Sequence, residues 1–172
     1  MNYPIIFYIL GCVLKFEGAF LMLPALVGIL YREDTVYPYL VMAGICLLIG
    51  QVLSWKKPKS SALYTRDGFV SVALSWIVMS IFGALPFVLT GDIPFFVDAL
   101  FETVSGFTTT GASILTDVEA LSHASLFWRS FTHWIGGMGV LVFIMAILPL
   151  MGGSTMNLMK AESPGPSVSK LV

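Results

Sequence analysis

The chain has 172 residues, of which 57% are hydrophobic and only 11% are charged, and its formal net charge is −1. A soluble domain carries about 25% charged residues, so this sequence has too little polar surface to cover a water-soluble globule. Its apolar residues come in long runs, which indicates a membrane protein, and a net charge so close to zero points to no particular partner.

Two apolar runs open the chain, and together they predict a helical hairpin in the membrane. They cover residues 4–30 and 36–55 and are separated by a short polar turn at residues 31–35. Each run is long enough to span a ~30 Å hydrocarbon core at ~1.5 Å per residue. The first run contains Lys15 and Glu17, which are two residues apart and therefore do not face each other on a helix. Intramembrane charges are often functional, but we favour snorkelling or contact with a neighbouring helix for both.

The distribution of basic residues predicts the orientation of the chain. The loop at residues 56–67 holds four of the nine basic residues: Lys56, Lys57, Lys59 and Arg66. By the positive-inside rule this loop is cytoplasmic, which places the N-terminus on the same side. Residues 68–89 and 126–151 predict a third and a fourth span, so that the polar tail at 152–172 is cytoplasmic as well. We therefore expect an all-α integral membrane protein with four spans.

The segment between the third and fourth spans, residues 90–125, contains five acidic residues but no lysine or arginine. We predict a helix over residues 94–105, with Asp92 near its N-cap and Pro94 in its first turn. Such a helix is ~18 Å long, which is too short to cross the membrane, so we expect it to be re-entrant. We expect the acidic residues to form a mostly solvated face. The apolar side of the helix would carry Phe95, Phe96, Ala99, Leu100, Thr103 and Val104, and the polar side Asp98, Glu102 and Ser105.

Residues 105–113, which read Ser-Gly-Phe-Thr-Thr-Thr-Gly-Ala-Ser, predict an extended chain inside the membrane. Consecutive β-branched threonines disfavour a helix, and Gly111 permits a positive φ. An extended strand can present carbonyl oxygens that replace the hydration shell of a monovalent cation, and the helix before it would point its partially negative C-terminus to the same place. From the pattern alone, an external loop with a surface helix remains the alternative.

At these residues the sequence resembles the TrkH/KtrB family of potassium transporters. The resemblance continues through residues 126–139, which read Leu-Phe-Trp-Arg-Ser-Phe-Thr-His-Trp-Ile-Gly-Gly-Met-Gly, and it includes residues 83–87, 146–149 and 161–166. The N-terminal hairpin is similar to TrkH rather than to KtrB. The family fold implies four helix–pore-loop–helix (M1–P–M2) repeats around one pore, of which only one is matched here.

The resemblance implies a domain order and an ion site. The order is an N-terminal transmembrane hairpin at 1–55, a cytoplasmic basic loop at 56–67, one pore repeat at 68–151 and a linker to a second repeat at 152–172. Because only one filter strand of four is matched, we expect either a truncated product or an assembly of several chains. The resemblance places potassium coordination on the carbonyl oxygens of four residues, with Thr109 and Thr110 as the strongest candidates: Thr108, Thr109, Thr110 and Gly111.

The same resemblance implies the setting in which the protein works. Potassium would be the substrate, with no covalent cofactor. The protein would lie in the inner (plasma) membrane in contact with lipid, with both termini in the cytoplasm. It would form a homodimer and bind a cytoplasmic nucleotide-binding regulatory subunit of the TrkA type. We expect no nucleic-acid partner, because the basic cluster flanks a membrane span.

Several residues around the predicted filter have a structural and a functional interpretation. Arg129 could line a vestibule with Asp98 and Glu102, but we favour a structural tie to an external carboxylate or carbonyl, because an arginine at the filter would repel the ion. For His133 we favour a satisfied interfacial histidine over a pH sensor. Three glycines of the fourth span favour close helix packing over a gating hinge: Gly136, Gly137 and Gly139.

Two other functions compete with potassium uptake by a Trk-type protein. A homotetrameric potassium channel would need only one pore loop per chain, but the Thr-Val-Gly-Tyr-Gly filter typical of such channels is missing. A membrane fragment that keeps the shape without conducting is the other alternative. An enzyme is not expected, because the sequence lacks the catalytic motifs of metalloproteases, α/β-hydrolases and P-loop proteins.

Overall fold

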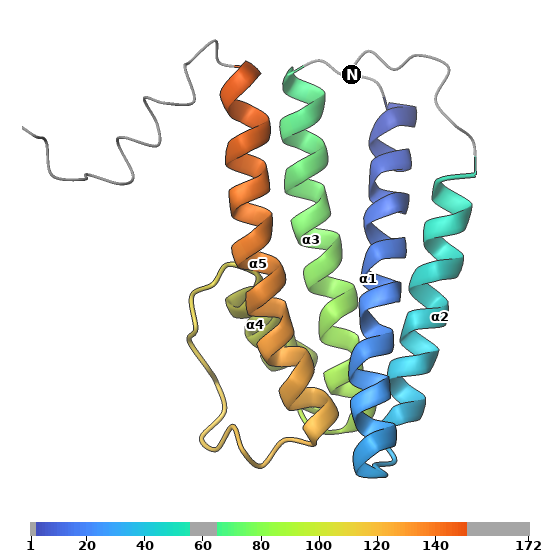
Figure 1. The fold of residues 1–172 in the computed structure, drawn as a ribbon, viewed down its shortest axis with the longest axis vertical. Coiled ribbons are helices and arrows are strands. Elements are labelled where there is room, and N and C mark those ends of the chain that lie inside the picture. Colours follow the sequence, from blue (N-terminus) through green and yellow to red (C-terminus); the bar gives the residue numbers. More distant parts are fainter. Residues whose placement is uncertain (1–2, 56–64, 151–172) are drawn as a thin grey trace, which may run out of the picture. The chain divides into compact units, whose positions relative to one another are not determined.

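The structure, a computed structural model, describes residues 3–55 and 65–150, apart from the side chains of residues 65–66 and 140–150. By its contacts the chain divides into two units, Met1–Gly137 and Met138–Val172, and the first unit holds α1 to α4 and the beginning of α5. The described residues form five helices and no strand, which confirms the all-α class (Figure 1).

α1 (Tyr3–Tyr31) and α2 (Val36–Leu53) form the hairpin, and they run side by side (Figure 1). Their backbones are in contact at glycine residues, which have no side chain to keep the helices apart. A Cβ atom on Gly11 would lie 2.8 Å from the Gly50 carbonyl oxygen, and one on Gly50 would lie 2.7 Å from the Gly11 carbonyl oxygen. Gly18 is similarly close to the carbonyl oxygen of Ala43, at 3.0 Å. Small residues therefore bring the two helices together, as is common in membranes.

α3 (Thr65–Thr90) packs on α1, α2 and α4. It begins within the predicted basic loop, and residues 56–64 of that loop lie outside the described residues. Pro86, expected near the end of this span, lies inside the helix. α5 (His123–Leu150) begins three residues before the predicted fourth span. The linker at 152–172 is likewise not among the described residues.

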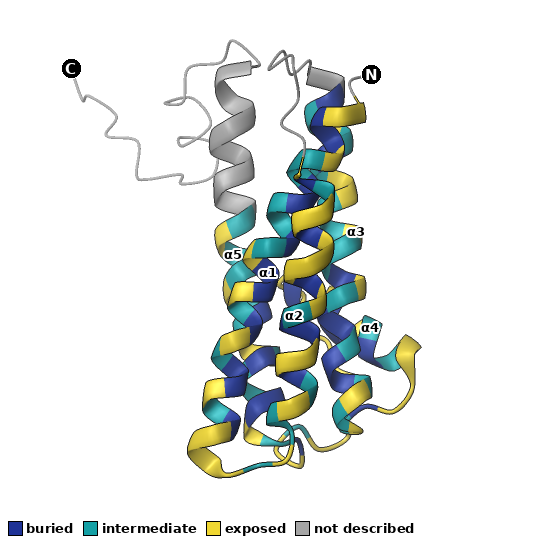
Figure 2. Cartoon of the chain, turned by 90° about the vertical axis from the view of Figure 1, so that its right-hand side faces the viewer, coloured by how far each residue is buried: buried dark blue, intermediate teal, exposed yellow. Residues whose placement is uncertain are grey.

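Three helices are long and apolar enough to cross a membrane by length and composition: Tyr3–Tyr31, Val36–Leu53 and Asp67–Thr90. The fourth predicted span coincides with α5, and since its last side chains are not described, its membrane crossing stays a prediction. Exposed residues cover the outer faces of the helices (Figure 2), and many of them are large and apolar. Several glycines and an alanine of α1 are buried, as is the charged Glu17. An apolar exterior of this kind is suited to lipid.

The turn between α1 and α2 is tied to the first turn of α5. The carboxylate of Glu33 accepts hydrogen bonds from the backbone N–H groups of His123 (2.8 Å) and Ala124 (3.2 Å), and it lies 2.8 Å from the His123 ring Nδ1. The Ser122 hydroxyl accepts the backbone N–H of Ser125 at 3.3 Å. The free N–H groups of the helix start are thereby satisfied, and a negative charge lies at the positive end of the helix dipole. This cap explains why α5 begins at His123.

Gly50→Ala should destabilise the protein, because the added methyl group would meet the Gly11 carbonyl oxygen at 2.7 Å and the Lys15 backbone nitrogen at 3.0 Å. We expect an overpacking cost of about 1–3 kcal/mol, which outweighs the ~1 kcal/mol that alanine gains over glycine in a helix. Gly44→Ala is the matched control on α2, because a Cβ atom there meets nothing within 4 Å. Thermal unfolding in detergent should give a lower midpoint for G50A than for G44A, and equal midpoints would contradict the close packing.

The cap on α5 should weaken in acid. Burial alone would raise the pKa of Glu33, but the hydrogen bonds from His123, Ala124 and Thr35 outweigh this and hold the pKa below its ordinary value. A carboxyl group of this kind stabilises the folded state above its ordinary pKa, and the contribution is lost as the pH falls through the folded value. The stability difference between the wild type and Glu33→Gln should therefore be full at neutral pH and disappear below about pH 4.

Thermal midpoints measured between neutral and acidic pH would check this dependence on Glu33. Asp34→Asn is the control, because Asp34 is exposed on the same turn and its carboxylate makes no hydrogen bond within the described part of the chain. A difference between wild type and E33Q that stays constant with pH, or one that D34N reproduces, would contradict the role of this cap.

Candidate functional site

α4 (Phe96–Phe107) is the predicted half-length helix, but it begins and ends two residues later than residues 94–105. The N-cap residue is Phe95, so the prediction of Asp92 near the N-cap was wrong. The reason is that the Asp92 carboxylate accepts a hydrogen bond from the Ser122 hydroxyl at 2.5 Å, beside the start of α5. In addition, the Ile93 N–H donates to the Phe87 carbonyl oxygen at 3.1 Å, which extends the turn after α3.

Part of the polar side of α4 is buried, contrary to the solvated acidic face expected from the sequence. Glu102 is only 1% exposed and Ser105 is buried as well, whereas Phe96 and Val104 of the predicted apolar side are exposed. Asp98 is half-buried, and its carboxylate makes no hydrogen bond or ion pair within the described residues. Glu102 can be buried because hydrogen-bond donors surround its carboxylate.

Three groups surround the Glu102 carboxylate. Arg129 Nε donates to Oε2 at 2.9 Å, while the Ser113 hydroxyl and the Ile114 backbone N–H each donate to Oε1 at 2.6 Å. Hydrogen bonds to an ionised group are stronger than neutral ones, and they compensate here for the loss of water. Glu102 thus joins α4 both to α5 and to the chain that follows Gly111. Arg129, for its part, faces a carboxylate at this point.

The candidate filter segment, residues 108–111, leaves α4 through a left-handed turn. Thr109 has a φ of +55° and Gly111 a φ of +75°. The N–H groups of Thr109 and Thr110 donate to the carbonyl oxygens of Gly106 and Ser105, each at 2.9 Å, which is the hydrogen-bond pattern of a Schellman motif. A run of three extended threonines was expected, so the prediction was wrong at Thr109 and also at Thr108, whose φ of −84° and ψ of 2° are not those of an extended chain. A β-branched residue in this region is strained by about 1–3 kcal/mol.

The carbonyl oxygens of the candidate filter segment are free of partners within the described part of the chain. None of these four oxygens accepts a hydrogen bond there, although the Ala112 oxygen, which follows them, accepts one from the Ser105 hydroxyl at 2.6 Å. All four residues are exposed. The Thr108 hydroxyl bonds instead to the Val104 carbonyl oxygen and to the Thr110 hydroxyl, each at 2.7 Å. The segment therefore offers free backbone oxygens, while the hydroxyls of Thr108 and Thr110 bond to each other.

Two glycines bring the end of α4 into contact with α5. A Cβ atom on Gly136 would collide with the Phe107 carbonyl group, and one on Gly106 would collide with the side chain of Thr132. Gly137 is less crowded, since its Cβ atom would lie 4.0 Å from the Thr109 methyl group. Gly139 belongs to the second unit, and its role stays a prediction. The position of Gly136 fits close packing, while the hinge interpretation is untested.

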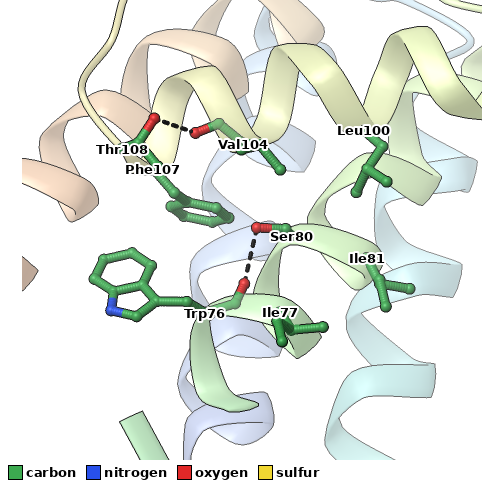
Figure 3. Close-up of a pocket in the computed structure, with 8 residues that line it drawn as sticks. All are labelled: Trp76, Ile77, Ser80, Ile81, Leu100, Val104, Phe107 and Thr108. Carbon is green, nitrogen blue, oxygen red and sulfur yellow. Dashed lines mark hydrogen bonds between the residues drawn. The ribbon is translucent and has the colours of Figure 1, made fainter. Parts of the chain in front are cut away.

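An apolar groove of about 360 Å³ lies beside the end of α4, against α3 (Figure 3). Phe107 contacts Trp76 edge to face across it, with ring centroids 6.0 Å apart. The Ser80 hydroxyl donates a hydrogen bond to the Trp76 carbonyl oxygen at 2.8 Å. The groove is thus an apolar wall next to the candidate filter segment. Its lining residues are Trp76, Ile77, Ser80, Ile81, Leu100, Val104, Phe107 and Thr108.

A half-length helix followed by a segment of free carbonyl oxygens, set among helices long enough to span a bilayer, defines a membrane protein of the pore-loop class. The chain belongs to the TrkH family of cation transport proteins, whose family model matches residues 40–171. The resemblance seen in the sequence is thereby confirmed.

Known relatives support the same assignment. The Trk system potassium uptake protein TrkH of Salmonella typhimurium is 38% identical over 168 residues, which are 96% of this chain and 35% of that protein. The Trk system potassium uptake protein TrkG of Escherichia coli is 40% identical over 146 residues, covering 83% of this chain and 30% of that protein. The chain therefore spans about a third of the length of the curated relatives that it matches.

A solved structure shows the same fold. The crystal structure of the potassium transporter TrkH from Vibrio parahaemolyticus matches with a TM-score of 0.81 and 37% sequence identity. The match covers 94% of this chain and 35% of that chain.

Some residues that position the helices and the loop around the candidate filter segment were not predicted from the sequence. The Trp128 indole N–H donates to the Gly83 carbonyl oxygen at 2.9 Å and so ties α5 to α3. Ser113 was seen only as part of the filter motif, not as a ligand of Glu102. Because a buried tryptophan needs a hydrogen-bond acceptor for its indole N–H, the sequence could have indicated that Trp128 has a partner. It could not indicate which residue this is, because Gly83 is far away in the chain. The bond between Glu102 and Ser113 was equally hidden, because it depends on the turn at Thr109.

Glu102→Ala should destabilise the protein strongly, because the Arg129 side chain is only 16% exposed and would lose its carboxylate. Removing one partner of a buried pair typically costs ~3–5 kcal/mol. Asp98→Ala, one turn earlier on α4, is the matched control. Thermal unfolding of the full-length protein in detergent should separate the two variants clearly. If E102A unfolded at the same temperature as D98A, Glu102 would not hold the segment as described.

Proposed function

We propose that this chain contributes one filter strand to a Trk-type protein that takes up potassium across the plasma membrane. The observation that carries the proposal is the candidate filter segment, whose free carbonyl oxygens follow a half-length helix. Relatives named as potassium uptake proteins of the Trk system support it. In this proposal the carbonyl oxygens of residues 108–111 replace the water around a potassium ion, chiefly those of Thr109 and Thr110.

The surroundings of the segment are suited to a cation. The C-terminus of α4 directs the negative end of its helix dipole toward residues 108–111. Arg129 would repel a cation if it were unpaired, but its charge is compensated by Glu102 at 2.9 Å. The segment is also anchored at both ends, by the turn at Thr109 and by the bonds of Ser113 and Ile114 to Glu102. Anchoring of this kind keeps the oxygens in place when the ion loses its water.

We further propose the assembly and location that the family resemblance implies. The protein would lie in the inner membrane with both termini in the cytoplasm, form a homodimer and bind a TrkA-type nucleotide-binding subunit. The names of the relatives, which place them in a Trk system, support a multi-component assembly. The homotetrameric channel is less favoured, because the chain matches a third of much longer transporters along nearly its whole length.

Potassium uptake by potassium-starved cells that lack their own transporters would test the proposal with the full-length protein. Gly111→Ser should lower the preference for potassium over sodium, because a side chain at a φ of +75° disturbs the neighbouring carbonyl groups. A strain of about 1–3 kcal/mol, if it falls on the potassium-bound state alone, corresponds to a loss of selectivity of roughly 5- to 150-fold.

Gly91→Ser is the matched control for this experiment. Gly91 has a φ of +81° and open space around it, but it lies in the turn between α3 and α4. The control should therefore carry similar backbone strain without loss of selectivity. Unchanged discrimination in G111S, or an equal loss in G91S, would argue against residues 108–111 as a filter strand.

A further inference from the structure

Glu17 lies in the middle of α1 and is buried, with 1% of its surface exposed. Within residues 3–55 and 65–150, neither of its carboxyl oxygens has a hydrogen-bond partner. Snorkelling, one of the interpretations favoured from the sequence, is therefore excluded for this residue. An ionised carboxylate in such a place is so unfavourable that the group normally keeps its proton instead.

The carboxyl group fills the space that Gly83 leaves on α3. A Cβ atom on Gly83 would lie 3.1 Å from Glu17 Oε1, 3.1 Å from the Thr103 methyl group and 3.4 Å from the Phe107 ring. The polar groups at this point already have partners: the Thr103 hydroxyl donates to the Ala99 carbonyl oxygen at 2.8 Å, and the Gly83 carbonyl oxygen accepts the bond from α5. Glu17 therefore lies at the place on α3 where the side chains of Thr103 and Phe107 from α4 also pack.

Among the described side chains of α1, α2 and α3, none places a counter-charge beside Glu17. Lys15 is two positions away on α1, and its side chain lies beside Gly50 of α2. α2 carries no charged residue, and its titratable side chains are Tyr37, Tyr39 and Cys46. The Tyr39 hydroxyl is bonded to Ser125 at 2.9 Å. The charged residues of α3, at 66 and 67, lie in its first turn, far along the helix from Gly83.

The charged groups of α4 and of the beginning of α5 are also engaged elsewhere. Glu102 and Arg129 pair with each other, and His133 Nδ1 lies 2.9 Å from the Arg129 carbonyl oxygen. His123 contacts Glu33 at the start of α5. Asp98 carries the same sign as Glu17 and would not compensate it. Within the described part of the chain, the ion pairs are those of Glu33 with His123 and of Glu102 with Arg129.

We propose that Glu17 is a proton-binding site, which holds a proton as a neutral carboxylic acid while α1 is packed against α3 at Gly83. Release breaks the O–H bond of the acid and passes the proton to water. It leaves a charge among Gly83, Thr103 and Phe107, and this charge loosens the contact of α1 with α3, on which α4 also packs. Because Phe107 directly precedes the candidate filter segment, release of the proton would also lower ion uptake. That last consequence alone rests on the proposed function.

Infrared spectroscopy of the purified full-length protein tests the site without reference to transport. The wild type at neutral pH should show the carbonyl-stretch band of a protonated carboxylic acid, and Glu17→Gln should remove it. Glu119→Gln is the control, because Glu119 is exposed on the loop before α5, and this variant should keep the band. A band that survives in E17Q, or the absence of any band in the wild type, would overturn the proposal.

The pH dependence of stability gives a second, independent readout. Above the ordinary pKa of a glutamate, about 4.3, the unfolded chain has lost a proton that the folded chain keeps. The unfolding equilibrium of the wild type should therefore shift toward the unfolded state by roughly tenfold per pH unit relative to E17Q. An identical pH slope in both proteins would overturn the proposal.

Glu17→Met covers the case in which the glutamine variant fails to fold. A neutral, unpaired acid can be replaced by an apolar side chain of similar length, so E17M should fold at least as well as the wild type at neutral pH. A strong destabilisation of E17M would mean that Glu17 is charged and paired, and would overturn the proposal.

Potassium uptake measured against pH separates this proposal from the proposed function. The wild type should lose uptake on the alkaline side, while E17Q should retain it. If the infrared band assigns the proton to Glu17 but neither protein takes up potassium at any pH, the proposed function fails and the proton site stands. If both proteins take up potassium and the band is missing, the proton site fails alone.

Discussion

The carboxylate of Glu102 is the point on which the geometry of the pore loop depends. It is buried in α4, and it accepts hydrogen bonds from α5 and from the chain after Gly111. The half-length helix, the following loop and the next long helix thus share one charged centre. Because the three donors approach from two segments, the loop cannot move away without leaving a buried charge unpaired. Glu102 therefore determines the course of the backbone around the candidate filter segment.

Contact between backbones complements this charged centre. Gly106 and Gly136 allow α4 and α5 to cross so closely that a methyl group on either would collide with the other helix, and Gly11 and Gly50 do the same for α1 and α2. In lipid, helices gain little by hiding apolar side chains from one another, so close packing and hydrogen bonds must hold them together. The apolar side chains are correspondingly free to face outward, as their exposure shows.

The sequence predicted those features that depend on long apolar runs or on chain length. The hairpin, the third long helix and the half-length helix all follow from hydrophobicity and from the reach of a helix. It failed where a contact between distant segments decides the local structure. The start of α4 depends on the bond between Asp92 and Ser122, and the burial of Glu102 depends on Arg129. The left-handed Thr109 runs against the preference of a β-branched residue, so no local rule predicts it.

The cap that Glu33 provides for α5 has a consequence for the order of assembly. The carboxylate and the N–H groups that it accepts are 90 and 91 positions apart in the sequence. During synthesis the hairpin emerges first, long before the helix that it caps. The backbone N–H groups of His123 and Ala124 therefore lack this acceptor until they meet a finished hairpin. The N-terminal hairpin thus acts as a template on which the later pore-forming helix is completed.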